Sequence, residues 1–114
     1  MRILFFGTPD FAVPTLRAIH SGPHDVVGVV SQPDRPKGRG RAVHPSPVSA
    51  FAQEQALPLW RPEKVGEPEV AEALRALEPD MGVVVAFGQF IPKRIRELPS
   101  KGYCINAHGS LLPD

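Results

Sequence analysis

The sequence has few of the features that mark secreted or membrane proteins. Cys104 is its one cysteine, so no internal disulfide can form. No apolar run approaches the ~18 residues that a membrane-spanning helix requires. The apolar stretch after Met1 is also too short for the h-region of a signal peptide. These absences predict a cytoplasmic protein without a membrane partner.

The usual nucleotide and metal motifs are also missing. The first apolar run is followed by Gly7-Thr8-Pro9-Asp10, where a dinucleotide-binding fold carries three spaced glycines. Only Gly7 is present, which disfavours NAD and FAD, and no phosphate-binding loop motif occurs. His20 and His24 have ligand-like spacing, but Gly22-Pro23 would break the helix that could bring them together. We therefore predict no metal site.

Charge is nearly balanced over the whole chain, with 13 basic and 12 acidic residues. It is uneven locally, because Arg35, Lys37, Arg39 and Arg41 lie between Gln32 and His44 with Asp34 as the one acid. Residues 31–45 are also rich in proline and glycine, which predicts a long loop without regular structure. A basic, extended segment of this kind suits binding to phosphates. The alternative is a solvated surface loop.

Short apolar runs alternate with segments of helical periodicity along the chain. Asp10 and Ser46 are suitable N-caps for two of the helices. We expect strands at 2–6, 26–30, 57–60, 83–87 and 102–106, and helices at 11–20, 48–55, 67–78 and 91–98. This alternation predicts an α/β fold, a Rossmann-like three-layer domain with a mainly parallel sheet.

Two polar residues lie where the last predicted strand ends. Asn106 and His108 are two positions apart, so strand geometry would place them on one face where the strand runs out. An amide can stabilise an oxygen that gains negative charge, and an imidazole can transfer a proton near neutral pH. The alternative is an asparagine that forms a turn and a histidine at the surface.

The run Asn106-Ala107-His108-Gly109-Ser110-Leu111-Leu112-Pro113 resembles the N-x-H-x-S-L-L-P signature of folate-dependent formyltransferases. The stretches 6–12, 32–40, 45–48 and 84–89 are similar to the same family, so the resemblance covers nearly the whole chain. The basic loop is typical of the branch that formylates methionyl initiator tRNA. Glycinamide-ribonucleotide and sugar-nucleotide formyltransferases lack this insertion.

The resemblance implies a one-carbon transferase of translation initiation. It would move a formyl group from 10-formyltetrahydrofolate, without a metal, to the amino group of methionyl initiator tRNA. Asn106 and His108 match catalytic positions of the family. The folate-binding positions would be Ser110, Leu111, Leu112, Pro113, Phe87, Gly88 and Gln89. The tRNA-binding loop would contribute Arg35, Lys37, Arg39 and Arg41, with Arg39 as the best candidate for a key contact.

The chain also departs from the family pattern. The family's catalytic aspartate follows some tens of residues after the signature, and Asp114 comes too soon to replace it. We therefore expect residues 1–114 to form a truncated, N-terminal portion of the catalytic domain. The remainder of that domain and a C-terminal tRNA-binding barrel would be absent, so this portion alone would have little activity. The full-length enzyme is expected to be a monomer.

Two other functions remain open at this point. A hydrolase would release formate from the same folate and would not need the basic loop. A non-catalytic module would bind folate or RNA without transferring the formyl group.

Overall fold

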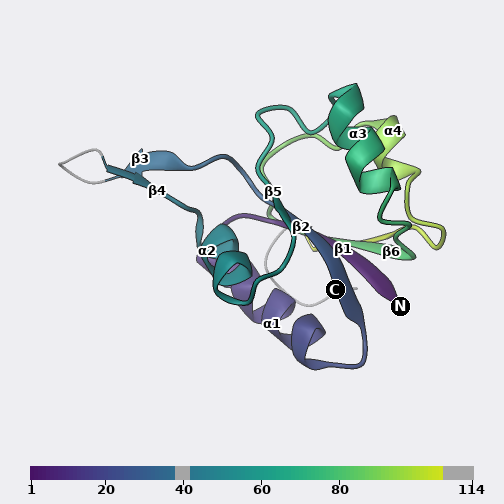
Figure 1. The fold of residues 1–114 in the computed structure, drawn as a ribbon, viewed down its shortest axis with the longest axis horizontal. Helices are drawn as coiled ribbons and strands as arrows, with labels where there is room; N and C mark the ends of the chain where they lie inside the picture. Colours follow the sequence, from purple (N-terminus) through teal and green to yellow (C-terminus); the bar gives the residue numbers. More distant parts are fainter. Residues whose placement is uncertain (38–41, 107–114) are drawn as a thin grey trace.

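The computed structural model describes residues 1–37 and 42–106 of the chain (Figure 1). A five-stranded sheet forms its centre, with strands in the order β5-β2-β1-β6-β7 and every pairing parallel. These strands are β1 (Arg2–Gly7), β2 (Asp25–Val30), β5 (Leu59–Trp60), β6 (Met81–Val85) and β7 (Tyr103–Asn106). The order runs outward in both directions from β1, which is the doubly wound arrangement. The predicted α/β class with a parallel sheet is therefore confirmed.

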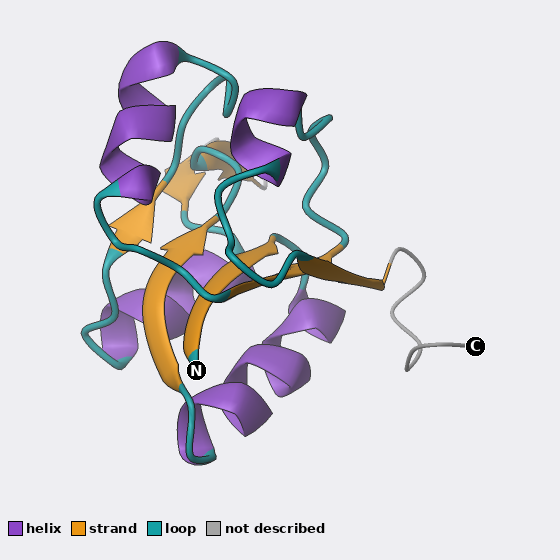
Figure 2. Cartoon of the chain, turned by 90° about the vertical axis from the view of Figure 1, so that its right-hand side faces the viewer, coloured by secondary structure: helices purple, strands orange, loops and turns teal. Residues whose placement is uncertain are grey.

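Helices cover both faces of the sheet (Figures 1 and 2). One face carries the short 3₁₀ helix η1 (Asp10–Ala12), α1 (Val13–Ser21) and α2 (Pro47–Glu54). The other face carries α3 (Pro68–Arg75) and α4 (Lys93–Arg96). Among the described residues, no helix has the length and apolar character required to cross a lipid bilayer. The three-layer prediction is confirmed.

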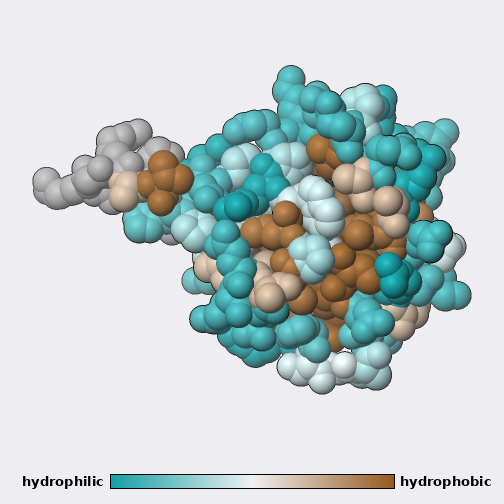
Figure 3. Space-filling view, in the orientation of Figure 1, coloured by the Kyte–Doolittle hydropathy of each residue, from teal (hydrophilic) through white to brown (hydrophobic). Residues whose placement is uncertain are grey.

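Strand β1 contributes to two hydrophobic cores at once. Phe5 packs with Leu16 and other residues of the α1/α2 side, while Leu4 and Phe6 pack with the α3/α4 side. All three β1 side chains are fully buried, because alternate residues of a strand point to opposite faces and both faces are covered. Viewed as in Figure 1, apolar surface gathers at the centre of the molecule and hydrophilic residues surround it (Figure 3).

The two predicted N-caps have different outcomes. Ser46 caps α2 as predicted, since its hydroxyl accepts the backbone N–H of Ser49 at 3.1 Å. The prediction for Asp10 is wrong. The N–H of Ala12 donates to the carbonyl of Pro9 at 3.0 Å, which closes a 3₁₀ turn and delays the α-helix to Val13. The Asp10 side chain lies within that turn and caps neither helix.

The expected loop at 31–45 contains a β-hairpin, which corrects the prediction of no regular structure. Strand β3 (Arg35–Lys37) pairs antiparallel with β4 (Ala42–His44), and Arg35 is opposite His44. We call residues 32–45 the arm, because the hairpin projects away from the sheet (Figure 1). The alternation of apolar residues that signals a half-buried strand is lacking here, and the strand residues whose burial is described, Arg35 and 42–44, are all exposed.

Strand β6 ends two residues earlier than predicted. Ala86 has a φ of 50°, in the left-handed region, so the extended backbone stops at Val85. The chain then turns and inserts Phe87 into the core on the α3/α4 side. The apolar character of 86–87 thus comes from a buried turn, and sequence pattern alone does not distinguish it from strand.

Candidate functional site

The carboxyl ends of four parallel strands meet at one edge of the sheet. Thr8 follows β1, Ser31 and Gln32 follow β2, and the turn 86–89 follows β6. The last described residue of β7, Asn106, lies beside Val85 in the ladder. In open α/β sheets, ligands bind in the crevice outside this edge, so it is the candidate site.

Thr8 joins three of these loops. Its hydroxyl donates to the carbonyl oxygen of Phe87 at 2.7 Å and accepts the backbone N–H of Gln32 at 3.4 Å. One side chain therefore holds the segments after β1, β2 and β6 together. Gly7 allows the ends of β1 and β6 to lie close together, because a Cβ there would lie 3.0 Å from the carbonyl oxygen of Val85. Its role in this fold is packing, in agreement with the missing dinucleotide fingerprint.

The predicted folate-binding residues after β6 lie in three different environments. Phe87 is only 2% exposed, and its ring packs edge-on against Phe6 with centroids 5.4 Å apart. Gly88 has a φ of +98°, and a Cβ there would lie 2.6 Å from the side-chain nitrogen of Gln32. Gln89 lines a pocket and also uses its amide in hydrogen bonds within the protein. Of the three, Gln89 is thus the side chain that lines a pocket, with its amide held by partners within the protein.

An apolar pocket of about 320 Å³ lies on the α3/α4 side of this edge. Phe90 is 81% exposed, which is unusual for a large aromatic residue. Val84, next to Val85 in β6, connects the pocket to the end of β7. The lining residues are Val84, Gln89, Phe90, Ile91, Arg96 and Tyr103. Size and apolar walls fit a small flat organic ligand with a few polar groups.

Most of these lining residues were not foreseen from the sequence. Tyr103 and Val84 have the pattern of ordinary strand residues, and Arg96 that of a solvated helix residue. A usable signal existed at Phe90 and Ile91, two large apolar residues between a strand exit and a proline. Such residues, in a loop at the carboxyl edge of a sheet, are candidates for a binding wall.

Tyr103 forms a rigid wall of the apolar pocket. Its ring covers Gly82, where an added Cβ would collide with the aromatic carbons. Its hydroxyl donates to the carbonyl oxygen of Ile95 at 2.7 Å. Burial raises the pKa of the Tyr103 phenol, because the charged phenolate would lose water. The ring is therefore neutral at physiological pH and fixed between β6 and α4.

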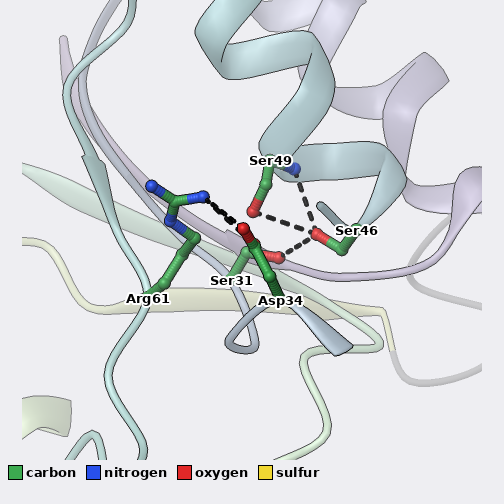
Figure 4. Close-up of polar contacts among 5 residues, drawn as sticks. All are labelled: Ser31, Asp34, Ser46, Ser49 and Arg61. Atoms are coloured by element: carbon green, nitrogen blue, oxygen red, sulfur yellow. Dashed lines mark hydrogen bonds and ion pairs between the residues drawn. The ribbon is translucent and has the colours of Figure 1, made fainter. Parts of the chain in front are cut away.

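The base of the arm is held by two sets of polar contacts (Figure 4). Ser46 Oγ lies 2.7 Å from Ser31 Oγ, so the two residues that flank the arm are bonded to each other. Ser46 Oγ also donates to Ser49 Oγ at 3.1 Å. In addition, Arg61 Nη1 donates to both carboxylate oxygens of Asp34 at 3.0 Å. These contacts tie the arm to α2 and to the segment after β5.

Beyond its base, the arm presents positive charge to solvent. The Arg35 side chain is largely exposed, and the distance of 3.8 Å to Glu63 makes a weak ion pair. Arg35 and His44 also line a cavity of about 180 Å³ with Thr8 and Gln32. Lys37 lies in β3, and Arg39 and Arg41 lie outside the described residues.

The remaining predicted residues are in part beyond the described chain. His108 and the run Ser110, Leu111, Leu112 and Pro113 lie outside it, so their roles stay predictions. Asn106 is placed by its backbone at the end of β7. A third cavity, of about 400 Å³, is lined mainly by charged residues before and within α3, among them Glu63, Lys64 and Glu67. Its charged lining residues make it a poorer site for a flat organic ligand than the apolar pocket.

Comparisons with known proteins give one consistent result. The pattern of the formyl transferase family matches residues 1–114. The chain is 52% identical over 113 residues to the methionyl-tRNA formyltransferase of Geotalea uraniireducens, which covers 99% of this chain and 36% of the relative. It is 54% identical over 113 residues to that of Desulfotalea psychrophila, with 99% and 35% covered. For Synechococcus sp. the identity is 53% over 114 residues, with 99% and 33% covered.

The chain therefore spans about a third of the length of the curated relatives that it matches. The family pattern extends over all of its residues, including the sheet and the candidate site. The chain belongs to the formyl transferase family.

Proposed function

We propose that this chain is the N-terminal portion of the catalytic domain of a cytoplasmic, monomeric enzyme. The enzyme transfers a formyl group from 10-formyltetrahydrofolate to the amino group of methionyl initiator tRNA. Relatives with more than 50% identity over nearly the whole chain carry the name of this activity. The proposal thus adds a specific formyl donor and a specific formyl acceptor to the family membership.

The observation that carries the proposal is the apolar pocket beside the end of β7. A pterin ring is flat and largely apolar on its faces, with hydrogen-bonding groups on its edge. The pocket offers walls such as Phe90, Ile91 and Tyr103 for those faces. Asn106 ends the neighbouring strand, so a donor in this pocket would have its formyl group near the catalytic positions.

The chemistry is attack of the neutral amine on the formyl carbon. A new C–N bond forms, and the carbonyl oxygen gains negative charge in the tetrahedral intermediate. The Asn106 amide would donate a hydrogen bond to that oxygen. The bond from the formyl carbon to the folate nitrogen then breaks, and His108 would take the surplus proton from the attacking amine and deliver it to that folate nitrogen. Ser110 to Pro113 would complete the folate contacts.

The arm supplies the contacts to the acceptor. Arg35, Lys37, Arg39 and Arg41 would neutralise phosphates of the tRNA, and exposure of Arg35 in a projecting hairpin supports this role. A hydrolase of the same folate has no use for such an arm. The arm therefore favours transfer to RNA over release of formate.

The test is an assay of the complete protein that carries this chain, with 10-formyltetrahydrofolate and charged initiator tRNA. We expect formylated methionyl-tRNA, and a loss of about 10²–10³-fold in kcat for Asn106→Ala, the range for one oxyanion donor. His108→Ala should also lose activity, while His24→Ala, a partly buried matched control just before the amino end of β2, should not. Formate without tRNA would indicate the hydrolase, and unchanged function of His108→Ala would indicate a binding module.

A further inference from the structure

We infer that Gln32 and Gln89 are a positioning pair that holds the base of the arm at a fixed place relative to the apolar pocket. The inference rests on the proposed function, in which the pocket takes the formyl donor and the arm takes the acceptor RNA. It adds two residues that would set the geometry between the two substrates without contacting the reacting atoms.

A direct hydrogen bond joins the two side chains. Gln89 Nε2 donates to Gln32 Oε1 at 2.9 Å. Gln89 lies in the wall of the apolar pocket, whereas Gln32 is the first residue of the arm and lines the cavity that contains Arg35 and His44. One bond therefore connects a wall of the donor pocket to the root of the basic hairpin.

The orientation of the Gln89 amide is fixed by its other partners. Its oxygen accepts the backbone N–H of Val65 at 2.8 Å, and its nitrogen donates to the carbonyl oxygen of Pro62 at 3.0 Å. Because Val65 offers only a donor and Pro62 only an acceptor, a flipped amide would lose both bonds. Both hydrogens of the Gln89 amide thus have protein acceptors, and its role is to hold rather than to reach for a ligand.

Gln32 is held by its backbone and by this one side-chain bond. Its backbone N–H donates to Thr8 Oγ1, and its side-chain nitrogen lies close to Gly88, whose φ of +98° favours glycine. Glycine at position 88 thus allows the turn after β6 to approach this side chain. The loops after β1, β2, β5 and β6 are linked through Thr8, Gln32 and Gln89.

A link of this kind should affect the rate of transfer more than the binding of either substrate. Each site keeps its own contacts when the bond is removed, but their relative placement loosens. A displacement of about 1 Å between reacting groups can cost about 10²-fold in rate. The pair should therefore appear in kcat while both KM values stay nearly constant.

The experiment uses the complete protein with Gln32→Met, Gln89→Met and the double variant. We expect kcat for formyl transfer to fall about 10–100-fold in each single variant, with each KM within about threefold of wild type. The double variant should be no slower than Gln89→Met, because residues that share one bond are not additive. Gln32→Glu keeps an acceptor for Gln89 and should retain near wild-type kcat. Gln53→Met, on the exposed surface of α2, is the matched control.

Thermal melting would verify that each variant is folded, and hydrogen exchange gives a readout apart from catalysis. Backbone amides at the arm base should exchange faster in Gln32→Met and Gln89→Met than in wild type. Multiplicative losses in the double variant, or unchanged kcat and exchange, would overturn the inference while leaving the proposed function intact. If the wild-type protein transfers no formyl group, the proposed function fails. Hydrogen exchange of the backbone amides at the arm base would then still show whether Gln32 and Gln89 hold the arm in place.

Discussion

The sheet and the arm differ in how far their side chains are buried. In the sheet, Leu4, Phe5 and Phe6 are fully buried, so the volume of the surrounding core determines which side chains fit at these positions. In the arm, the side chain of Val43 is 63% exposed, and the described hairpin pairs only with itself. Burial therefore explains the residues of the sheet but not the exposed residues of the arm. The contacts at the arm base are where the two regions meet.

The largest expected effect is a cavity in the sheet. Leu4→Ala should lower the free energy of unfolding by about 3 kcal/mol, because a fully buried leucine leaves a void that the core cannot fill. Val43→Ala, a truncation in the arm, should change it by less than about 0.5 kcal/mol. Urea unfolding of both variants measures the contrast. Equal destabilisation would mean that the arm packs as part of the core.

The reverse contrast is expected when the charge of the arm is removed. Changing Arg35, Lys37, Arg39 and Arg41 together to glutamine should leave thermal stability nearly unchanged. It should weaken tRNA binding about 10²-fold and reduce the salt dependence of binding by about 3 logarithmic units per decade of salt. Titrations at several salt concentrations test this. An unchanged salt slope would show that the arm does not contact phosphates.

A smaller effect is expected at Tyr103, at the boundary between core and pocket. Tyr103→Phe removes the hydrogen bond to Ile95 and should cost about 1 kcal/mol. The folded pKa is raised, so above pH about 10 the unfolded chain loses the Tyr103 proton while the folded chain retains it. This contribution to stability is present below that pH and is lost as the pH rises. Wild type should therefore lose stability above pH 10 more steeply than Tyr103→Phe, as pH-dependent unfolding would show.

An effect on stability smaller than that at Tyr103 is expected at the arm base. Asp34→Asn weakens the ion pair with Arg61, which is partly exposed, so the cost should be about 0.5 kcal/mol. The arm itself should respond more clearly, with faster hydrogen exchange near residues 33–35. Glu63→Gln, which removes the longer and more exposed pair with Arg35, is the control and should leave exchange unchanged. Equal exchange in both variants would show that Asp34 does not hold the arm.

The same contrast explains how far sequence could predict this structure. Apolar runs gave the five parallel strands and four helices to within a few residues, since burial dictates those positions. The Ser46 cap was also predictable, because it depends on neighbouring residues only. The hairpin of the arm was missed because no core selects its residues, and the 3₁₀ turn at Asp10 because a single backbone bond decides it.

Some features of the candidate site could also be predicted from the sequence, and others could not. Sequence located the strand end at Asn106 and placed Gly88 and Gln89 at the exit of a strand, although it extended that strand to Phe87. It did not separate the buried Phe87 from Gln89, nor reveal the bond between Gln89 and Gln32, which are 57 residues apart. The pocket walls at Tyr103 and Arg96 were missed for the same reason, because they depend on how β7 and α4 pack. Long-range contacts of this kind have no local pattern.

The most direct test of the proposed donor site is to map where a folate analogue binds. Chemical-shift perturbation by a non-reactive 10-formyltetrahydrofolate analogue, measured on the complete protein, would identify the residues that it touches. We expect the largest shifts at Val84, Ile91 and Tyr103, in the apolar pocket beside β7. Shifts confined to the charged groove around Glu67, with the signals of Ile91 and Tyr103 unmoved, would contradict the assignment of the donor to this edge of the sheet.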